Sequence, residues 1–255
     1  MTIPHDDRGL LLGDGLFETV LALDGKLVGL AAHLDRMAAG CAVMGLPPLD
    51  RALAERLMGE ALAGVAAPRA AVRLTLTAGS GGRGLDRPDA PEPRLFATAA
   101  ASQLPSGPAR LITSSVRRNE GSPAARLKTL SYLDSVLARR QAREQGGDEA
   151  LMLNSREEAA CAAAANVFWV SEGRLLTPAL ECGVLAGTMR ARVLAAAGRL
   201  GVAVAEVQAP GQTLRGADAI FLTNSLIGVR AVSSLDGVEL RPSALVEQLA
   251  AAVAV

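Results

Sequence analysis

The sequence predicts a mixed α/β protein in two lobes, and three observations support this. Half of the 255 residues are apolar, so the chain can bury a sizeable core, although aromatic residues make up only 2%. Apolar residues recur at helical spacing in some segments and form short runs typical of strands in others. Turn-forming residues dominate 101–109, where we place the boundary between a lobe of 1–104 and a lobe of 105–255.

The first lobe alternates strands and helices. Residues 24–26 read as a hairpin turn after a strand, and the first helix stops before Pro47 and Pro48. A loop rich in glycine and proline separates the last two strands. The expected strands are 16–23, 70–78 and 94–100, and the expected helices are 30–46 and 49–64.

The second lobe also mixes both kinds of element. A helix that ends at Gly146 and Gly147 follows the first strand, and a second helix begins near Gly187. We expect strands at 110–116, 149–154, 164–170, 174–178 and 219–225, and helices at 132–145 and 188–201.

Composition excludes several classes of function. The net charge is zero and the pI is near 6.8, so the chain lacks the basic character of nucleic-acid binders. The three cysteines, Cys41, Cys161 and Cys182, are odd in number and widely spaced, which argues against disulfides and a zinc site. No apolar run is long enough to span a membrane. We therefore expect a soluble cytoplasmic protein without a metal that acts on a small molecule.

Lys128 is one of only two lysines among the 26 basic residues. Chance is one explanation for a lysine in a chain that otherwise uses arginine. The other is chemistry that arginine cannot perform, because an ammonium group can lose its proton and attack a carbonyl to form a Schiff base. Lys128 is therefore a candidate nucleophile.

The glycine-rich stretch GSGGRG, residues 79–84, matches the spacing of a dinucleotide-binding loop. That motif requires a helix directly after it, and the three prolines in the following segment, residues 85–93, argue against one. A plain flexible turn is one remaining interpretation. The other is an active-site loop in which Arg83 receives a substrate carboxylate.

Two further segments can hold an anion. Gly187 and Thr188 begin a helix, where free backbone N–H groups and the helix dipole favour negative charge. An ordinary threonine cap is the alternative there. Asn224 and Ser225 lie at a strand end in TNSLIGV and offer amide and hydroxyl donors. Together with Lys128, these segments match what pyridoxal 5'-phosphate (PLP) requires: a Schiff-base lysine and a phosphate cup.

Ordered motifs across most of the chain resemble one family. These are RGLLLGDGLFETV with HLDRM, TAGSGGRG, RLKTLSYLDSVLARRQAREQGGDEALMLN, AANVFWV, GVLAGTMR and TNSLIGV. They are similar to the fold-type IV PLP enzymes, the class IV aminotransferases, and within them most closely to aminodeoxychorismate lyase. The resemblance implies an α/β fold of the α+β type, with a small α/β sandwich lobe and a larger pseudo-barrel lobe. It also implies a homodimer.

The resemblance assigns roles to individual residues. Lys128 corresponds to the Schiff-base lysine and proton shuttle, and Arg36 to the arginine that binds the cofactor phosphate. Thr188 and Met189 correspond to the helix start whose amides bind that phosphate, and Ser225, next to Asn224, to a hydroxyl donor. Tyr132 is near the position of a tyrosine that contacts the cofactor in some members, and a purely structural role is equally open.

Cys161 departs from the family pattern. It lies five residues before Asn166, where the family has a glutamate that pairs with the pyridine nitrogen and keeps it protonated. Glu158 would face the opposite side of a regular strand. Glu157 would lie roughly 13 Å along the strand, at about 3.3 Å per residue. Neither glutamate is a direct replacement unless the strand contains a bulge.

Three activities remain compatible with these residues. The first is an aminodeoxychorismate-lyase-like reaction that yields 4-aminobenzoate and pyruvate, in which aromatisation compensates for a weaker electron sink. The second is an aminotransferase that acts on branched-chain or D-amino acids. The third is a PLP-binding homologue whose catalysis is impaired by Cys161.

Overall fold

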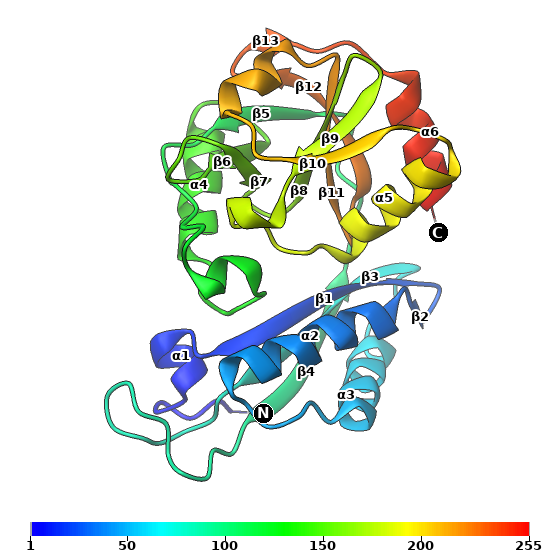
Figure 1. Cartoon of the computed structure of the whole chain (residues 1–255). Coiled ribbons are helices and arrows are strands. Elements are labelled where there is room, and N and C mark those ends of the chain that lie inside the picture. The colour runs from blue at the N-terminus through cyan, green and yellow to red at the C-terminus, as the bar shows by residue number, and fades with distance from the viewer. Residues whose placement is uncertain (1, 255) are drawn as a thin grey trace. The chain divides into compact units, whose positions relative to one another are not determined.

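A computed structural model describes residues 2–254, which divide into two compact units (Figure 1). Unit 1 runs to Leu104 and also includes Leu127–Ser131. Unit 2 comprises Pro105–Arg126 and Tyr132 onward. Each unit has its own sheet and its own buried core, so each is described separately.

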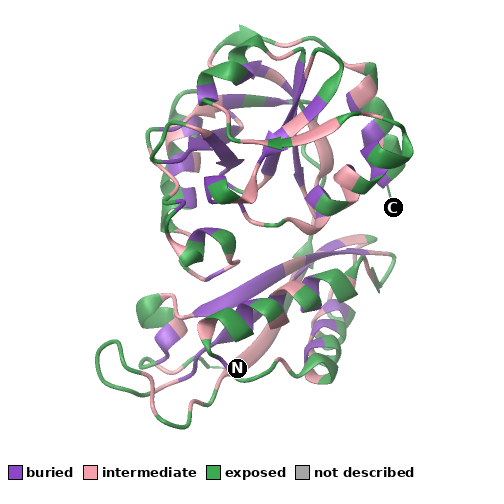
Figure 2. Cartoon of the chain, viewed as in Figure 1, coloured by how far each residue is buried: buried purple, intermediate pink, exposed green. Residues whose placement is uncertain are grey.

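Unit 1 is built on a four-stranded antiparallel sheet in the order β2-β1-β3-β4. Alternate residues of β3 are apolar, and this places Val72 and Leu74 in the core beneath helices α2 and α3. Figure 2 shows β1 as a largely buried strand, while much of the loop between β3 and β4 is exposed. The bounds are β1 Gly15–Leu23, β2 Lys26–Leu27, α2 Leu30–Met44, α3 Arg51–Ala63, β3 Arg69–Thr77 and β4 Arg94–Ala101.

A short helix, α1 (Arg8–Leu12), precedes β1 and was not expected from the sequence. Asp7 caps it, since its side chain accepts hydrogen bonds from the backbone N–H groups of Gly9 and Leu10. Thr77 Oγ1 donates to the second oxygen of the same carboxylate at 2.8 Å. The cap thereby fixes α1 to the end of β3.

The segment Leu127–Ser131 pairs with the edge of β1. Phe17 N donates to the carbonyl of Lys128 at 2.9 Å, and Leu130 N donates to the carbonyl of Gly15 at 3.0 Å. Through these bonds Lys128 groups with unit 1, although it lies within the range 105–255 expected for the C-terminal lobe. The reason is edge pairing between residues more than a hundred positions apart, which hydrophobic periodicity does not reveal.

Unit 2 contains a nine-stranded mixed sheet, ordered β10-β9-β8-β11-β12-β5-β6-β7 with β13 beside β12. Figure 1 shows these strands curling around an apolar centre, which confirms the expected pseudo-barrel. Trp169 lies fully buried within it. The strands are β5 Ala109–Thr113, β6 Glu149–Leu153, β7 Ala159–Ala162, β8 Asn166–Ser171, β9 Arg174–Pro178, β10 Val204–Val207, β11 Ala219–Asn224, β12 Gly228–Leu235 and β13 Val238–Glu239.

Three helices pack against the sheet of unit 2: α4 (Leu133–Glu144), α5 (Thr188–Arg199) and α6 (Ala244–Val253). Every strand and helix expected in the sequence is present within a few residues of its expected bounds. The short strands β2, β7, β10 and β13, with β12 and helix α6, were not expected. Within residues 2–254, no helix is both long and apolar enough to cross a membrane.

Gly15 provides a test of how the Lys128 segment is held. A Cβ at this position would lie 2.3 Å from the Leu76 carbonyl oxygen and 2.7 Å from a methyl carbon of Leu130. We expect Gly15→Ala to lower the free energy of unfolding by about 1–3 kcal/mol, because both neighbouring segments must shift. Urea denaturation measures this change.

The matched control is Gly59→Ala, in the middle of α3, where a Cβ meets nothing within 4 Å. It should raise the free energy of unfolding by about 0.5–1 kcal/mol, since alanine is the better helix former. Equal effects of the two substitutions would contradict the close pairing of β1 with residues 127–131.

Candidate active site

Lys128 lies in a partly buried, aromatic and cationic environment in unit 1. Its Nζ is 4.3 Å from the centroid of the Phe17 ring, and the Cζ atom of Arg73 is 3.6 Å from the same centroid. The pKa of Lys128 is lowered to about 8, chiefly by burial, with Glu18 opposing the shift and Arg36 and Arg73 adding to it. About a tenth of this amine is therefore uncharged at pH 7, far more than for an ordinary lysine, and the uncharged form is the nucleophile.

The carboxylate of Glu18 organises this cluster. Glu18 is buried on β1, and Arg36 of α2 donates to it twice, from Nε at 2.7 Å and from Nη2 at 2.6 Å. His33 Nδ1 lies 2.7 Å from Oε2 of the same carboxylate. Burial alone would raise the pKa of Glu18, but the hydrogen bonds from His33 and Arg36 outweigh it and lower that pKa.

Sequence analysis identified Arg36 but missed Glu18, His33 and Arg73. The signal for Glu18 was present, because it is a single carboxylate inside an otherwise apolar strand run. A buried carboxylate requires a partner, and two donors one turn apart on the following helix supply it. Glu18 thus fixes the orientation of the Arg36 guanidinium.

Three segments of unit 2 converge at the start of α5. Asn166 begins β8 and pairs with Thr223 of β11, and its Nδ2 donates to the carbonyl of Leu185 at 2.9 Å. A Cβ on Gly187 would lie 2.0 Å from Asn166 Oδ1, so only glycine fits there. Asn224 Nδ2 donates to the Ala164 carbonyl at 2.9 Å. This contact holds the turn after β11 against the loop before β8.

The residues predicted to bind phosphate lie around this convergence. Thr188 is the first residue of α5, and Gly187 before it provides no side-chain cap. Met189 is buried in the core of unit 2, so only its backbone is available to a ligand. Ser225 directly follows β11, and Asn224 Oδ1 accepts hydrogen bonds from the N–H groups of Leu226 and Ile227. The helix start can therefore direct N–H groups toward an anion.

Cys161 lies on β7, opposite Met152 of β6, and is a buried free thiol. Burial raises the pKa of this thiol. The pairing of β6 with β7 shifts register between Cys161 and Ala159, so the strand does contain an irregularity of the kind that could redirect a glutamate. Both glutamates are nevertheless engaged by other side chains. Glu157 is bound by Arg117, and Glu158 is bound by Arg156 and Asn154.

Arg83 is exposed on the loop between β3 and β4. Arg8 anchors this loop by donating to the carbonyls of Asp86 at 2.9 Å and Leu85 at 2.8 Å. A Cβ on Gly82 would lie 2.0 Å from the Asp86 carbonyl, so glycine is required at this tight turn. The GSGGRG motif therefore serves a constrained loop, and among the described residues no helix lies between it and β4.

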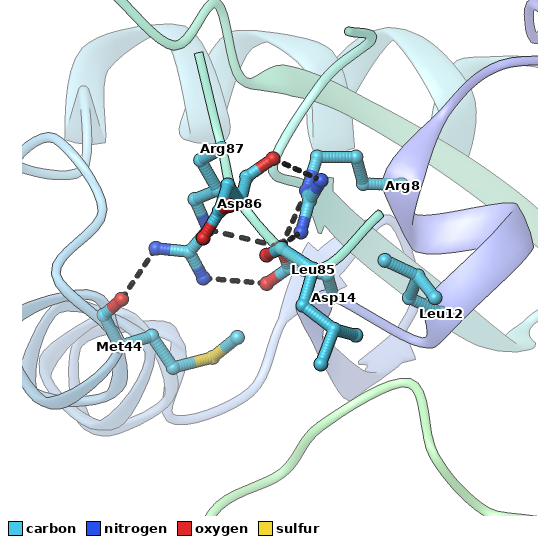
Figure 3. Close-up of a pocket in the computed structure, with 7 residues that line it drawn as sticks. All are labelled: Arg8, Leu12, Asp14, Met44, Leu85, Asp86 and Arg87. Atoms are coloured by element: carbon cyan, nitrogen blue, oxygen red, sulfur yellow. Dashed lines mark hydrogen bonds and ion pairs between the residues drawn. The ribbon is translucent and has the colours of Figure 1, made fainter. Parts of the chain in front are cut away.

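An open pocket of about 590 Å³ lies beside this loop (Figure 3). Asp14, which lines the pocket, accepts hydrogen bonds from Arg87 and from Arg8, and the Arg8 Nε lies 2.9 Å from Asp14 Oδ2. These contacts lower the pKa of Asp14, and the hydrogen bonds from Arg87 contribute most. Arg87 also donates to the carbonyl of Met44 at 2.6 Å. Both guanidinium groups are committed to loop anchoring, so we assign this pocket a structural role.

Tyr132 precedes the first residue of α4, and its side chain makes no capping hydrogen bond to that helix.

The candidate residues divide between the units. Lys128, Arg36 and Arg83 belong to unit 1, while Cys161 and the four residues around the start of α5 belong to unit 2. Within residues 2–254, no group of three or more His, Cys, Asp or Glu side chains is arranged to hold a metal ion.

Comparison with known proteins places these features in a family. The family model described as amino-transferase class IV matches residues 15–235, which cover most of both units and include all the candidate residues. The chain belongs to the class IV aminotransferases. This family depends on PLP, which confirms the cofactor expected from the sequence.

Three relatives illustrate the range of activities among similar proteins. A Methanocaldococcus jannaschii protein, provisionally named a branched-chain-amino-acid aminotransferase, is 34% identical over 91% of this chain and 82% of its own length. The 4-amino-4-deoxychorismate lyase of Pseudomonas aeruginosa is 33% identical, with a TM-score of 0.87 over 98% of this chain and 93% of that one. A branched-chain aminotransferase from Thermoproteus uzoniensis with norvaline is 25% identical, with a TM-score of 0.90 over 98% and 87%.

The residues of this member of the class IV family fit PLP at two points. The partly buried, low-pKa amine of Lys128 suits covalent attachment to an aldehyde. The start of α5 suits a phosphate group, because it is the positive end of a helix dipole and because position 187, beside Asn166 Oδ1, has room only for glycine. Cys161 is the position at which the donor set departs from the family.

The pH dependence of Lys128 acylation tests its environment. With the cofactor removed, reaction of this amine with acetic anhydride should rise with pH and reach its midpoint near 8, because only the neutral amine reacts. Arg73→Gln should raise the midpoint, since it removes a cation that disfavours the protonated amine. Glu18→Gln should lower it, because a favourable anion is lost.

Mass spectrometry of the Lys128 peptide measures this profile, and the Lys26 peptide serves as an internal reference for reagent quality. A midpoint near the ordinary lysine value of about 10.4 would contradict the described environment.

Proposed function

We propose that this chain is a PLP-dependent lyase that converts 4-amino-4-deoxychorismate to 4-aminobenzoate and pyruvate. The observation that carries the proposal is the replacement of a carboxylate by the neutral thiol of Cys161, with both nearby glutamates engaged elsewhere. Without a carboxylate beside it, the cofactor ring withdraws electrons less strongly. A reaction whose product gains aromatic stabilisation needs less of this electron withdrawal. The similarity to the Pseudomonas lyase over nearly the whole chain supports the same assignment.

The protein residues have distinct roles in this proposal. Lys128 holds the cofactor covalently, and Arg36 and the start of α5 bind its phosphate. When bound, PLP withdraws electrons from the carbon that carries the substrate amine. Lys128 Nζ, when not bonded to the cofactor, would accept the proton that the substrate ring releases and would return it to the enolpyruvyl group, which leaves as pyruvate when its C–O bond to the ring breaks. Its lowered pKa favours the uncharged form needed for that step.

Arg83 and Arg36 complete the charge balance of the proposal. Arg83, exposed on its anchored loop, would receive a substrate carboxylate. Arg36 keeps its orientation through Glu18, so phosphate binding and the electrostatics of Lys128 depend on one carboxylate. We also propose a cytoplasmic homodimer, which rests on the family resemblance and on three cysteines that remain free thiols.

A second function is supported by a specific observation. The 34% identity to the Methanocaldococcus protein over 91% of this chain favours a branched-chain aminotransferase. In that case leucine or valine alone would convert the bound cofactor to its amino form, and no 4-aminobenzoate would appear.

One experiment separates these functions. The PLP-loaded protein is supplied with 4-amino-4-deoxychorismate, and 4-aminobenzoate is followed by fluorescence while pyruvate is followed by coupled reduction. We expect equal amounts of both products. Lys128→Ala and Lys128→Arg should each reduce the rate by about 10²–10⁴-fold, the usual contribution of a positioned proton-transfer group.

Circular dichroism of the two variants establishes that they fold. No 4-aminobenzoate from the wild-type protein, combined with cofactor conversion by leucine, would reverse the ranking of the two activities. Loss of both activities in a protein that binds PLP would instead support the impaired homologue.

A further inference from the structure

The surroundings of Cys161 carry an inference that rests on the proposed function and deepens it. Family resemblance aligns Cys161 with the glutamate that pairs with the pyridine nitrogen of PLP. Arg118 lies near Cys161, because its backbone N–H donates to the carbonyl of Leu153, the residue after Met152, and Met152 is paired with Cys161. Arg118 and Glu149 are also the charged groups that act electrostatically on Cys161. Both belong to unit 2, as Cys161 does, so their arrangement is fixed within one unit.

Arg118 carries a positive charge that no carboxylate neutralises by direct contact. Its Nη2 donates to the carbonyl of Ala125 at 2.5 Å, and its Nε donates to the carbonyl of Gly183 at 3.3 Å. Its backbone N–H donates to the carbonyl of Leu153 at 2.8 Å. Within residues 2–254 its hydrogen bonds go only to backbone carbonyls, so the guanidinium is held in place with its charge intact.

Glu149 does not supply the missing anion. It lies at the start of β6, three residues before Met152, the residue opposite Cys161. That separation is about 10 Å along a strand at roughly 3.3 Å per residue. Arg139 donates to its carboxylate at 3.1 Å, and Ala150 N donates to the other oxygen at 3.0 Å. The carboxylate is thus neutralised by a partner on α4.

The chain therefore offers a neutral thiol and a nearby cation where the family offers an anion. A carboxylate stabilises a protonated pyridine ring through opposite charge, whereas a cation destabilises it. A buried thiol does not provide a negative charge by ionising, because burial disfavours the thiolate.

We propose that Cys161 and Arg118 keep the pyridine nitrogen of bound PLP unprotonated in this protein. They act as specificity-determining residues, because an unprotonated ring withdraws electrons less strongly and disfavours transamination. Elimination to an aromatic product is less demanding and remains possible. The substitution thereby directs the reaction toward the lyase outcome.

The test uses PLP labelled with ¹⁵N in the ring, bound to the full-length protein. We expect the ¹⁵N resonance of the wild-type protein at the position of an unprotonated pyridine from about pH 6.5 to about 8.5. Cys161→Glu should move it to the position of a protonated ring. Cys161→Ser, the matched neutral control, should leave it unchanged.

A second readout is the half-reaction with leucine, followed by the absorbance of the bound cofactor. We expect Cys161→Glu to accelerate it by about tenfold or more, and Cys161→Ser to have no such effect. Arg118→Gln provides an independent arm if the glutamate variant does not fold. Removal of the cation should raise the pH at which the ring becomes protonated.

The outcomes distinguish the two proposals. A protonated ring in wild-type protein that produces 4-aminobenzoate overturns this inference and leaves the proposed function intact. An unprotonated ring in a protein that makes no 4-aminobenzoate supports the inference and overturns the lyase assignment. An unchanged resonance in Cys161→Glu would show that residue 161 does not contact the ring.

Discussion

Unit 1 depends on one buried interaction, the contact of the Glu18 carboxylate with Arg36 and His33. It joins strand β1 to helix α2 and fixes the guanidinium that is proposed to bind phosphate. Breaking a buried pair of this kind typically costs about 3–5 kcal/mol, because the remaining charge stays desolvated. Glu18 also opposes the lowering of the Lys128 pKa by Arg36 and Arg73. The same carboxylate therefore affects the packing of unit 1, the proposed phosphate-binding arginine and the nucleophile.

The charge distribution suits a phosphorylated cofactor. Burial and two guanidinium groups keep the amine of Lys128 partly neutral, and the same guanidinium groups favour an anionic ligand. In unit 2, the uncapped start of α5 presents the positive end of a helix dipole. Arg118 adds a fixed cation near Cys161. Neutral and anionic groups of a ligand are therefore favoured at each of these points, and an additional positive charge is not.

Periodicity and turn residues were sufficient to predict the long elements, since β1, α2, α5 and most other strands and helices have strong local signals. Lys128 and Arg36 could be singled out by residue type and motif. The edge pairing of residues 127–131, the role of Glu18 and the position of Arg118 could not, because each depends on contacts between distant segments. Short elements such as α1 and β7 depend on caps and neighbours rather than on their own pattern.

The central claim is that Lys128 is the amine that holds the cofactor. Borohydride reduction of the PLP-loaded protein, followed by proteolysis and peptide mapping, tests this claim most directly. The account predicts a single modified peptide that contains Lys128, with the Lys26 peptide unmodified, and loss of the label in Lys128→Arg. Modification at Lys26 instead, or a protein that remains colourless and unlabelled after loading, would contradict it.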